Sequence, residues 1–177
     1  VYHDKRKDTV MSILLLAMMV PFAATLIPLF KLFTGLGLQS TWIAYILPTI
    51  STPFLIMLFR QSTRTFPREI IEAARIDGLS EIKIFAKLYF PTMKSTYAAA
   101  MTVTFMNAWN NYLWPKVIMM SADSQTMPMM VANLSAGYSI DYGVLMLGVL
   151  ICSLPTGILF LILQRSFTNG ILGAVKG

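Results

Sequence analysis

Residues 67–91, PREIIEAARIDGLSEIKIFAKLYFP, form a charged stretch within an otherwise apolar chain and predict two short helices around a glycine. Pro67 suits the first turn of a helix, where its missing N–H costs no hydrogen bond. Asp77 and Gly78 are expected to end this helix, because glycine takes a left-handed C-terminal conformation without strain. Ser80 is expected to cap the second helix. The apolar side chains of that helix recur at helical spacing on one face: Ile82, Phe85, Ala86 and Tyr89. Such a pair of helices between apolar segments predicts a docking element.

Four long apolar runs without Asp, Glu, Lys, Arg or His make up most of the remaining chain. They are residues 10–30, 42–59, 95–115 and 142–163. A helix needs about 20 residues to cross a hydrocarbon core of about 30 Å, so each run is expected to span a membrane. Pro21 and Pro28 are expected to bend the first. Because 56% of the residues are hydrophobic and only 12% are charged, we predict an all-α, polytopic membrane helical bundle rather than a soluble protein.

Charge placement predicts the orientation of this bundle. Twelve of the fourteen Lys and Arg residues lie in the opening segment, in the loop of residues 60–94, or in the C-terminal tail. The two loops on the other side of the predicted bundle contain only two basic residues, Lys31 and Lys116. By the positive-inside rule, the N-terminal segment, the central loop and the C-terminus are expected to be cytoplasmic. The net charge of +6 then reports topology, and nucleic acid is not an expected partner.

The spacing within the charged stretch resembles the EAA motif of ABC importer permeases. In that motif three residues separate EAA from a glycine, and nine more precede an apolar residue, any residue, a leucine and a proline. Here Glu72-Ala73-Ala74 is followed at those distances by Gly78 and by Leu88, Phe90 and Pro91. Asp77 also stands where the family commonly has aspartate. Leu88 and Phe90 depart from the usual residues but keep their apolar character.

A second stretch is similar to carbohydrate-uptake permeases, the group that includes maltose and lactose importers. Residues 109–115, WNNYLWP, resemble the WNxxLWP signature of the fifth helix in that group. Residues 25–29, 35–38 and 170–177 resemble its third helix, the following turn and its tail. Because family members usually have six spans, residues 1–177 are expected to be a single, partial type-1 permease domain that contains the last four.

The resemblance implies how the chain would work. The loop of residues 60–94 would enter a cleft on an ABC ATPase dimer at the cytoplasmic face. The expected ATPase-coupling residues are Glu72, Ala73, Ala74, Asp77, Gly78, Ile82, Phe85, Ala86 and Pro91. A second permease subunit, an extracytoplasmic solute-binding protein, membrane lipid and a sugar or oligosaccharide substrate are the other expected partners. The localisation implied is the bacterial cytoplasmic membrane.

The polar residues of the spans leave two interpretations open. Asn107, Asn110 and Asn111 need partners within a membrane. Hydrogen bonds between helices, or an interfacial position near the outer edge of the membrane, are favoured, and contact with a sugar in a substrate path is the alternative. The chain has no GxxxxGK[ST] loop for ATP and no clustered metal ligands, so neither a cofactor nor a metal is expected, and ATP hydrolysis is assigned to partner subunits. Import of glycerol phosphate or a polyol is the alternative within the family. A passive channel or a membrane-embedded enzyme is the alternative outside it.

Overall fold

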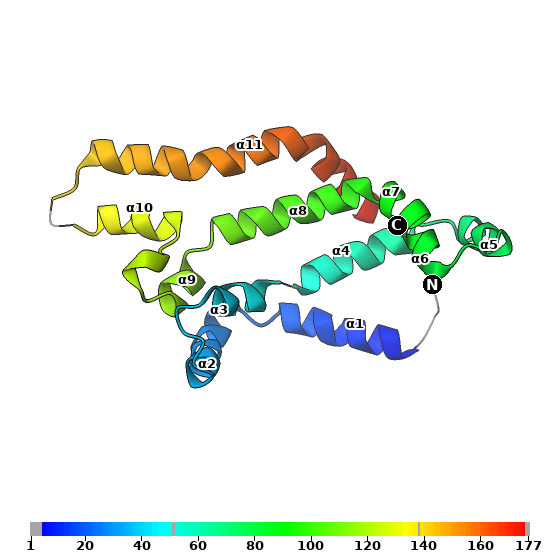
Figure 1. The fold of residues 1–177 in the computed structure, drawn as a ribbon, viewed down its shortest axis with the longest axis horizontal. Helices are drawn as coiled ribbons and strands as arrows, with labels where there is room; N and C mark the ends of the chain where they lie inside the picture. The colour runs from blue at the N-terminus through cyan, green and yellow to red at the C-terminus, as the bar shows by residue number, and fades with distance from the viewer. Residues whose placement is uncertain (1–4, 51, 138, 176–177) are drawn as a thin grey trace. The chain divides into compact units, whose positions relative to one another are not determined.

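The computed structural model describes residues 5–50, 52–137 and 139–175, and all regular elements within these ranges are helices (Figure 1). The prediction of an all-α fold is therefore confirmed. The predicted opening and tail segments include residues 1–4 and 176–177, which lie outside the described residues. The elements, in chain order, are α1 (Lys5–Met18), α2 (Phe22–Gly35), α3 (Trp42–Ile46), η1 (Leu47–Thr49), α4 (Pro53–Arg64), α5 (Arg68–Ile76), α6 (Glu81–Ile84), the π-helix η2 (Phe85–Tyr89), α7 (Phe90–Thr92), α8 (Lys94–Trp109), α9 (Leu113–Ile118), η3 (Ala122–Ser124), α10 (Met127–Ser135) and α11 (Tyr142–Val175).

The predicted spans differ from the observed helices mainly where prolines occur. Residues 142–164 of α11 are long and apolar enough to cross a membrane, although Pro155 lies inside the helix. Among the described residues this is the one continuous helix that qualifies. The number rises to three if the interrupted pairs α1–α2 and α3/η1–α4 each count as one span. The first interruption ends at Pro21, which precedes α2, whereas Pro28 is accommodated inside α2.

The third predicted span, residues 95–115, is not a single helix. The helix α8 ends at Trp109, and α9 begins only at Leu113. Pro115 gives the physical reason, because a continuous helix would press its ring against the carbonyl of Asn111. A separate short helix, α10, follows at Met127–Ser135.

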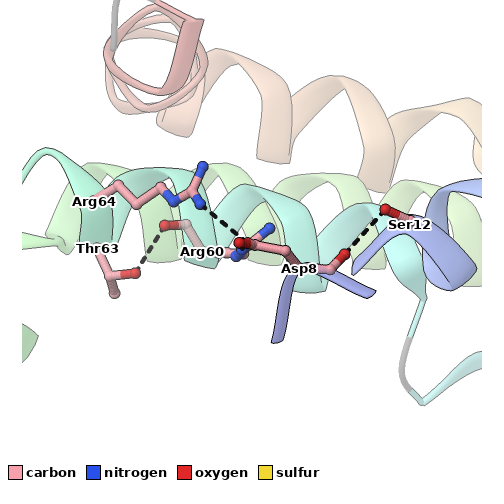
Figure 2. A network of polar contacts seen from close by, with 5 residues as sticks. All are labelled: Asp8, Ser12, Arg60, Thr63 and Arg64. Atoms are coloured by element: carbon pink, nitrogen blue, oxygen red, sulfur yellow. Dashed lines mark hydrogen bonds and ion pairs between the residues drawn. The ribbon is translucent and has the colours of Figure 1, made fainter. Parts of the chain in front are cut away.

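The described chain divides into two compact units, and each is treated by itself. The first comprises α1, residues 53–103 and the end of α11 from Ile162 onward. Within it, the Asp8 carboxylate of α1 lies 2.6 Å from the Arg60 guanidinium of α4 (Figure 2). On α8, the Thr96 hydroxyl donates a 2.9 Å hydrogen bond to the Ser62 hydroxyl of α4. The helix α4 is thus held by polar contacts to both α1 and α8.

The core between α4 and α8 contains small side chains. Ala99 and Ala100 are buried together with Leu58. Small residues let two helix backbones approach closely, which is how membrane helices gain packing energy without a strong hydrophobic drive between them. The AAA segment at residues 98–100 therefore belongs to a helix interface.

The second unit contains residues 19–52 and 104–161 and is built around Trp114. The Trp114 side chain is fully buried, and its ring contacts that of Phe33 at a centroid distance of 5.9 Å. Its indole N–H donates a 3.1 Å hydrogen bond to the carbonyl of Ala44. In a regular helix this carbonyl would accept from residue 48, but Pro48 has no N–H. Trp114 therefore supplies the donor that Pro48 lacks.

Candidate functional site

The candidate site is the helix–turn–helix of α5 and α6, which is organised by the turn at Gly78. Gly78 has φ +77°, a conformation that glycine adopts at little cost. Its N–H donates to the carbonyl of Arg75 at 3.0 Å, and the Leu79 N–H donates to the carbonyl of Ala74 at 3.0 Å. These two bonds constitute a Schellman motif, which satisfies the free carbonyls at the end of α5. The predicted stop at Asp77 and Gly78 is confirmed.

The beginnings of the two helices differ slightly from the prediction. Pro67 is the N-cap residue and α5 begins at Arg68, so Pro67 is not within the first turn. Ser80 occupies the N-cap position of α6, but its side chain makes no capping hydrogen bond. Its backbone carbonyl accepts from the Ile84 N–H at 2.9 Å. The helix α6 is consequently started by backbone geometry and by packing.

An apolar core, called the inner core of the loop below, packs α5 against α6 and η2. Phe66, Ile71, Ala74 and Ile84 are buried together, with Leu79, Leu88 and Tyr89 packed around them. The rings of Phe66 and Tyr89 lie 4.6 Å apart at an angle of 31°. Burial raises the pKa of the Tyr89 phenol above its usual value of 10.0, and Glu81 raises it further against an opposing effect of Arg75. At neutral pH Tyr89 is an uncharged packing group.

The two helices and η2 also expose apolar side chains among charged ones. Ile76 is 86% exposed and Ile82 is 80% exposed, although both are large aliphatic residues. Phe85 is also exposed, at 53%. An ion pair crosses the turn beside them, with Arg75 Nε 2.8 Å from Glu81 Oε1. Large apolar residues that are exposed outside the predicted spans are candidates for contact with a partner protein. We call the exposed surface with Ile76, Ile82 and Phe85 the outer face of the loop.

The predicted coupling residues are distributed unequally over this structure. Only Ala74 is buried, and its methyl group belongs to the inner core. All other predicted coupling residues are exposed: Glu72, Ala73, Asp77, Gly78, Ile82, Phe85, Ala86 and Pro91. Ala74 can therefore support the outer face but cannot form it.

The sequence reasoning missed two residues of the loop and misplaced one. Ile76 was not selected, although its position beside Asp77 at the end of α5 makes it the most exposed apolar residue of the loop. Ile84, which is 1% exposed, was also missed, and the i, i+4 pair Ile84–Leu88 was the signal for it. Tyr89 packs on the inner core and not beside Ile82, because the π-helix η2 changes the register of the side chains.

The three asparagines do not meet in one place. Asn110 lines a cavity of about 420 Å³ together with residues of α10 and α11. Its amide nitrogen donates a 3.0 Å hydrogen bond to the carbonyl of Met106 in the preceding helix α8. Asn107 is exposed and Asn111 is half-buried, and neither lines this cavity. The cavity walls are mostly aliphatic, with Tyr112, Ser135 and Ser153 as the other polar lining residues.

The part of the chain described here contains no group of three His, Cys, Asp or Glu side chains that could hold a metal ion. The outer face of the loop remains the candidate site, and its exposed apolar side chains are suited to contact with a protein.

Comparisons with known proteins identify the family of the chain. The sequence model of a family described as "Binding-protein-dependent transport system inner membrane component" matches residues 1–172. The lactose transport system permease protein of Rhizobium radiobacter is 46% identical over 175 residues, which are 99% of this chain and 64% of that protein. An arabinooligosaccharides transport system permease protein of Halalkalibacterium halodurans is 39% identical over 178 residues, covering 100% of this chain and 64% of the relative. The sn-glycerol-3-phosphate transport system permease protein of Escherichia coli is 29% identical over 163 residues, or 91% of this chain and 58% of that protein.

Proposed function

The chain belongs to the family of inner membrane components of binding-protein-dependent transport systems, and from this premise we propose that it acts in an importer for a sugar or an oligosaccharide. It spans 64% of the length of the lactose and arabinooligosaccharides permeases that it resembles. Both of these relatives are named for carbohydrate transport, and both are more similar to it than the glycerol phosphate permease. A sugar is therefore the favoured substrate, and glycerol phosphate is the alternative.

The outer face of the loop is the observation that carries the mechanism. A helix–turn–helix with a packed inner core and exposed isoleucines presents a rigid apolar surface, which is what a partner protein can bind at low entropic cost. In this proposal the partner is a dimer of ATPase subunits. Glu72 contributes a negative charge near the N-terminal half of α5, and a basic group on the ATPase would pair with it.

The import cycle follows from that contact. Closure of the ATPase dimer on ATP moves the loop, and the loop moves the helices that continue from it, α4 and α8. This movement turns the translocation path from the cytoplasmic side to the outer side, where a solute-binding protein delivers the sugar. A second permease subunit would form the other half of the path. The chain itself contributes no hydrolytic chemistry.

The topology proposed from charge placement is supported by the Asp8–Arg60 ion pair. The ion pair places the beginning of α1 beside the end of α4, immediately before the loop. An N-terminal segment and a loop joined in this way belong to the same side of the membrane, and the positive-inside rule makes this side cytoplasmic.

The test of the proposed function is reconstitution of the complete transporter that contains this chain, with its ATPase and binding protein, in proteoliposomes. We expect sugar uptake and ATP hydrolysis that both require the binding protein. Glu72→Lys should abolish uptake and weaken ATPase co-purification, because it reverses the charge on the outer surface of α5. The control Lys94→Glu changes the charge by the same amount at an exposed position outside the motif, and it should transport normally. Uptake that proceeds down a gradient without ATP would refute the importer in favour of a channel.

A further inference from the structure

Asp8 occupies a position that neither the motif nor the proposed function explains. Its carboxylate oxygen lies 2.6 Å from Nη2 of Arg60 and 3.6 Å from Nη2 of Arg64. The two arginines are one helical turn apart on α4, and Figure 2 shows both guanidinium groups directed toward Asp8. One acidic side chain of α1 thus pairs with two cations of another helix that is distant in sequence.

The charges also suit the helices that carry them. Asp8 lies in the first turn of α1, where the helix dipole favours a negative charge, and Arg64 lies in the last turn of α4, where it favours a positive one. Two arginines at i and i+4 repel each other, and Asp8 compensates this repulsion. The side chain of Arg60 is only 27% exposed, so water screens its contact with Asp8 less than it would at an open surface.

The position of the ion pair along the chain gives it a connection to the loop. Arg64 is the last residue of α4, and α5 begins at Arg68. Between them, the Phe66 N–H donates to the carbonyl of Thr63 at 3.4 Å, and the Phe66 ring belongs to the inner core of the loop. The arginines paired with Asp8 therefore lie at the base of the element that carries the outer face.

We propose that Asp8 is a positioning residue that fastens α1 to the base of the loop that carries the outer face, so that α1 moves with this loop. This inference rests on the proposed function, because it assigns the ion pair a role in transmitting the ATPase movement. The Ser62–Thr96 hydrogen bond already joins α4 to α8. With Asp8 in place, loop movement acts on α1, α4 and α8 together.

The experiment measures sugar transported per ATP hydrolysed in the complete transporter. Asp8→Asn should lower this ratio by about two- to fivefold, the range expected for loss of a partly exposed ion pair, while ATPase co-purification stays unchanged. Asp8→Arg should lower the ratio by about tenfold or more, because it places a third cation against Arg60 and Arg64. The exchanged pair Asp8→Arg with Arg60→Asp should restore the ratio to within about twofold of the wild type. Asp123→Asn, the same chemical change at an exposed residue of η3, should have no effect.

Two results would overturn the proposal: a normal ratio in Asp8→Asn, or an exchanged pair that transports no better than Asp8→Arg alone. Thermal unfolding in detergent of four proteins, the wild type, Asp8→Arg, Arg60→Asp and the exchanged pair, separates this inference from the proposed function. If the wild-type complex fails to couple ATP to uptake, the importer assignment is wrong, and the unfolding data alone decide about Asp8. Non-additive unfolding shifts in the exchanged pair would then support the fastening of α1 to α4, and additive shifts would overturn it.

Discussion

Substitutions at Gly78 can distinguish a loss of contact between the loop and its partner from a loss of stability in the turn itself. The residue has φ +77°, and a Cβ atom added there meets no atom of the described residues within 4 Å. Within this chain, the cost of a side chain at position 78 is therefore conformational and not steric. For alanine at positive φ this cost is about 1–2 kcal/mol. Asparagine enters the left-handed region more readily than alanine, so its conformational cost is lower.

If a partner protein covers Gly78, asparagine is expected to be the more harmful substitution there, although alanine has the higher conformational cost. Asparagine is larger than alanine, so in a filled cleft it excludes the ATPase more strongly even though it strains the turn less. We expect Gly78→Asn to abolish uptake and ATPase co-purification, and Gly78→Ala to reduce both by about five- to thirtyfold, the factor that 1–2 kcal/mol corresponds to. The assay is sugar uptake in membranes with co-purification of the ATPase subunit from the same sample.

Gly37 is the matched control. It has φ +69°, and in the described part of the chain its Cβ would also meet no atom within 4 Å. It ends α2 by the same pair of hydrogen bonds, from the Gly37 N–H to the Thr34 carbonyl and from the Leu38 N–H to the Phe33 carbonyl. At this position Gly37→Ala should cost more thermal stability than Gly37→Asn, and neither should affect ATPase association. If alanine is also the worse substitution at Gly78, the effect is turn strain alone and no partner packs on that glycine. Full uptake by both Gly78 variants would refute the docking surface.

Two further predictions test the second unit and the topology. Trp114→Ala should destabilise the protein by about 3–5 kcal/mol, because it empties a fully buried site. Trp114→Phe should destabilise it by about 1–3 kcal/mol, because it leaves the carbonyl of Ala44 without its donor. Thermal unfolding in detergent measures both, and equal stability of the phenylalanine variant and the wild type would show that the hydrogen bond is dispensable. In a Cys152→Ser background, a cysteine at exposed Lys83 should react with an impermeant maleimide only from the cytoplasmic side and one at exposed Asp123 only from the outside, so labelling of both from one side would contradict the proposed topology.

The sequence was sufficient for features that depend on local chemistry. The αL conformation of Gly78 and the end of α5 were predictable, because only glycine tolerates that backbone conformation easily. Helical spacing also placed Ile82 and Phe85 on one apolar face, but their exposure is a finding of the structure. Tyr89 was assigned to the wrong face, because a regular helical period was assumed through residues 85–89, where the structure has a π-helix. A change of register of this kind leaves little trace in single-residue propensities.

Composition and spacing by themselves determined the helical class, the apolar segments and the turn at Gly78, because these depend on hydrophobicity and backbone preference along the chain. The family was indicated by the resemblance of two motifs to those of known permeases. Only the tertiary structure decided which side chains meet. Trp114 donates to Ala44, 70 residues away, and Asp8 pairs with Arg60, 52 residues away. Nothing in the local sequence of Asp8 distinguishes it from a solvated acid at a helix start. Its partner is selected by the packing of α1 against α4, and packing between distant segments is a property of the folded chain alone.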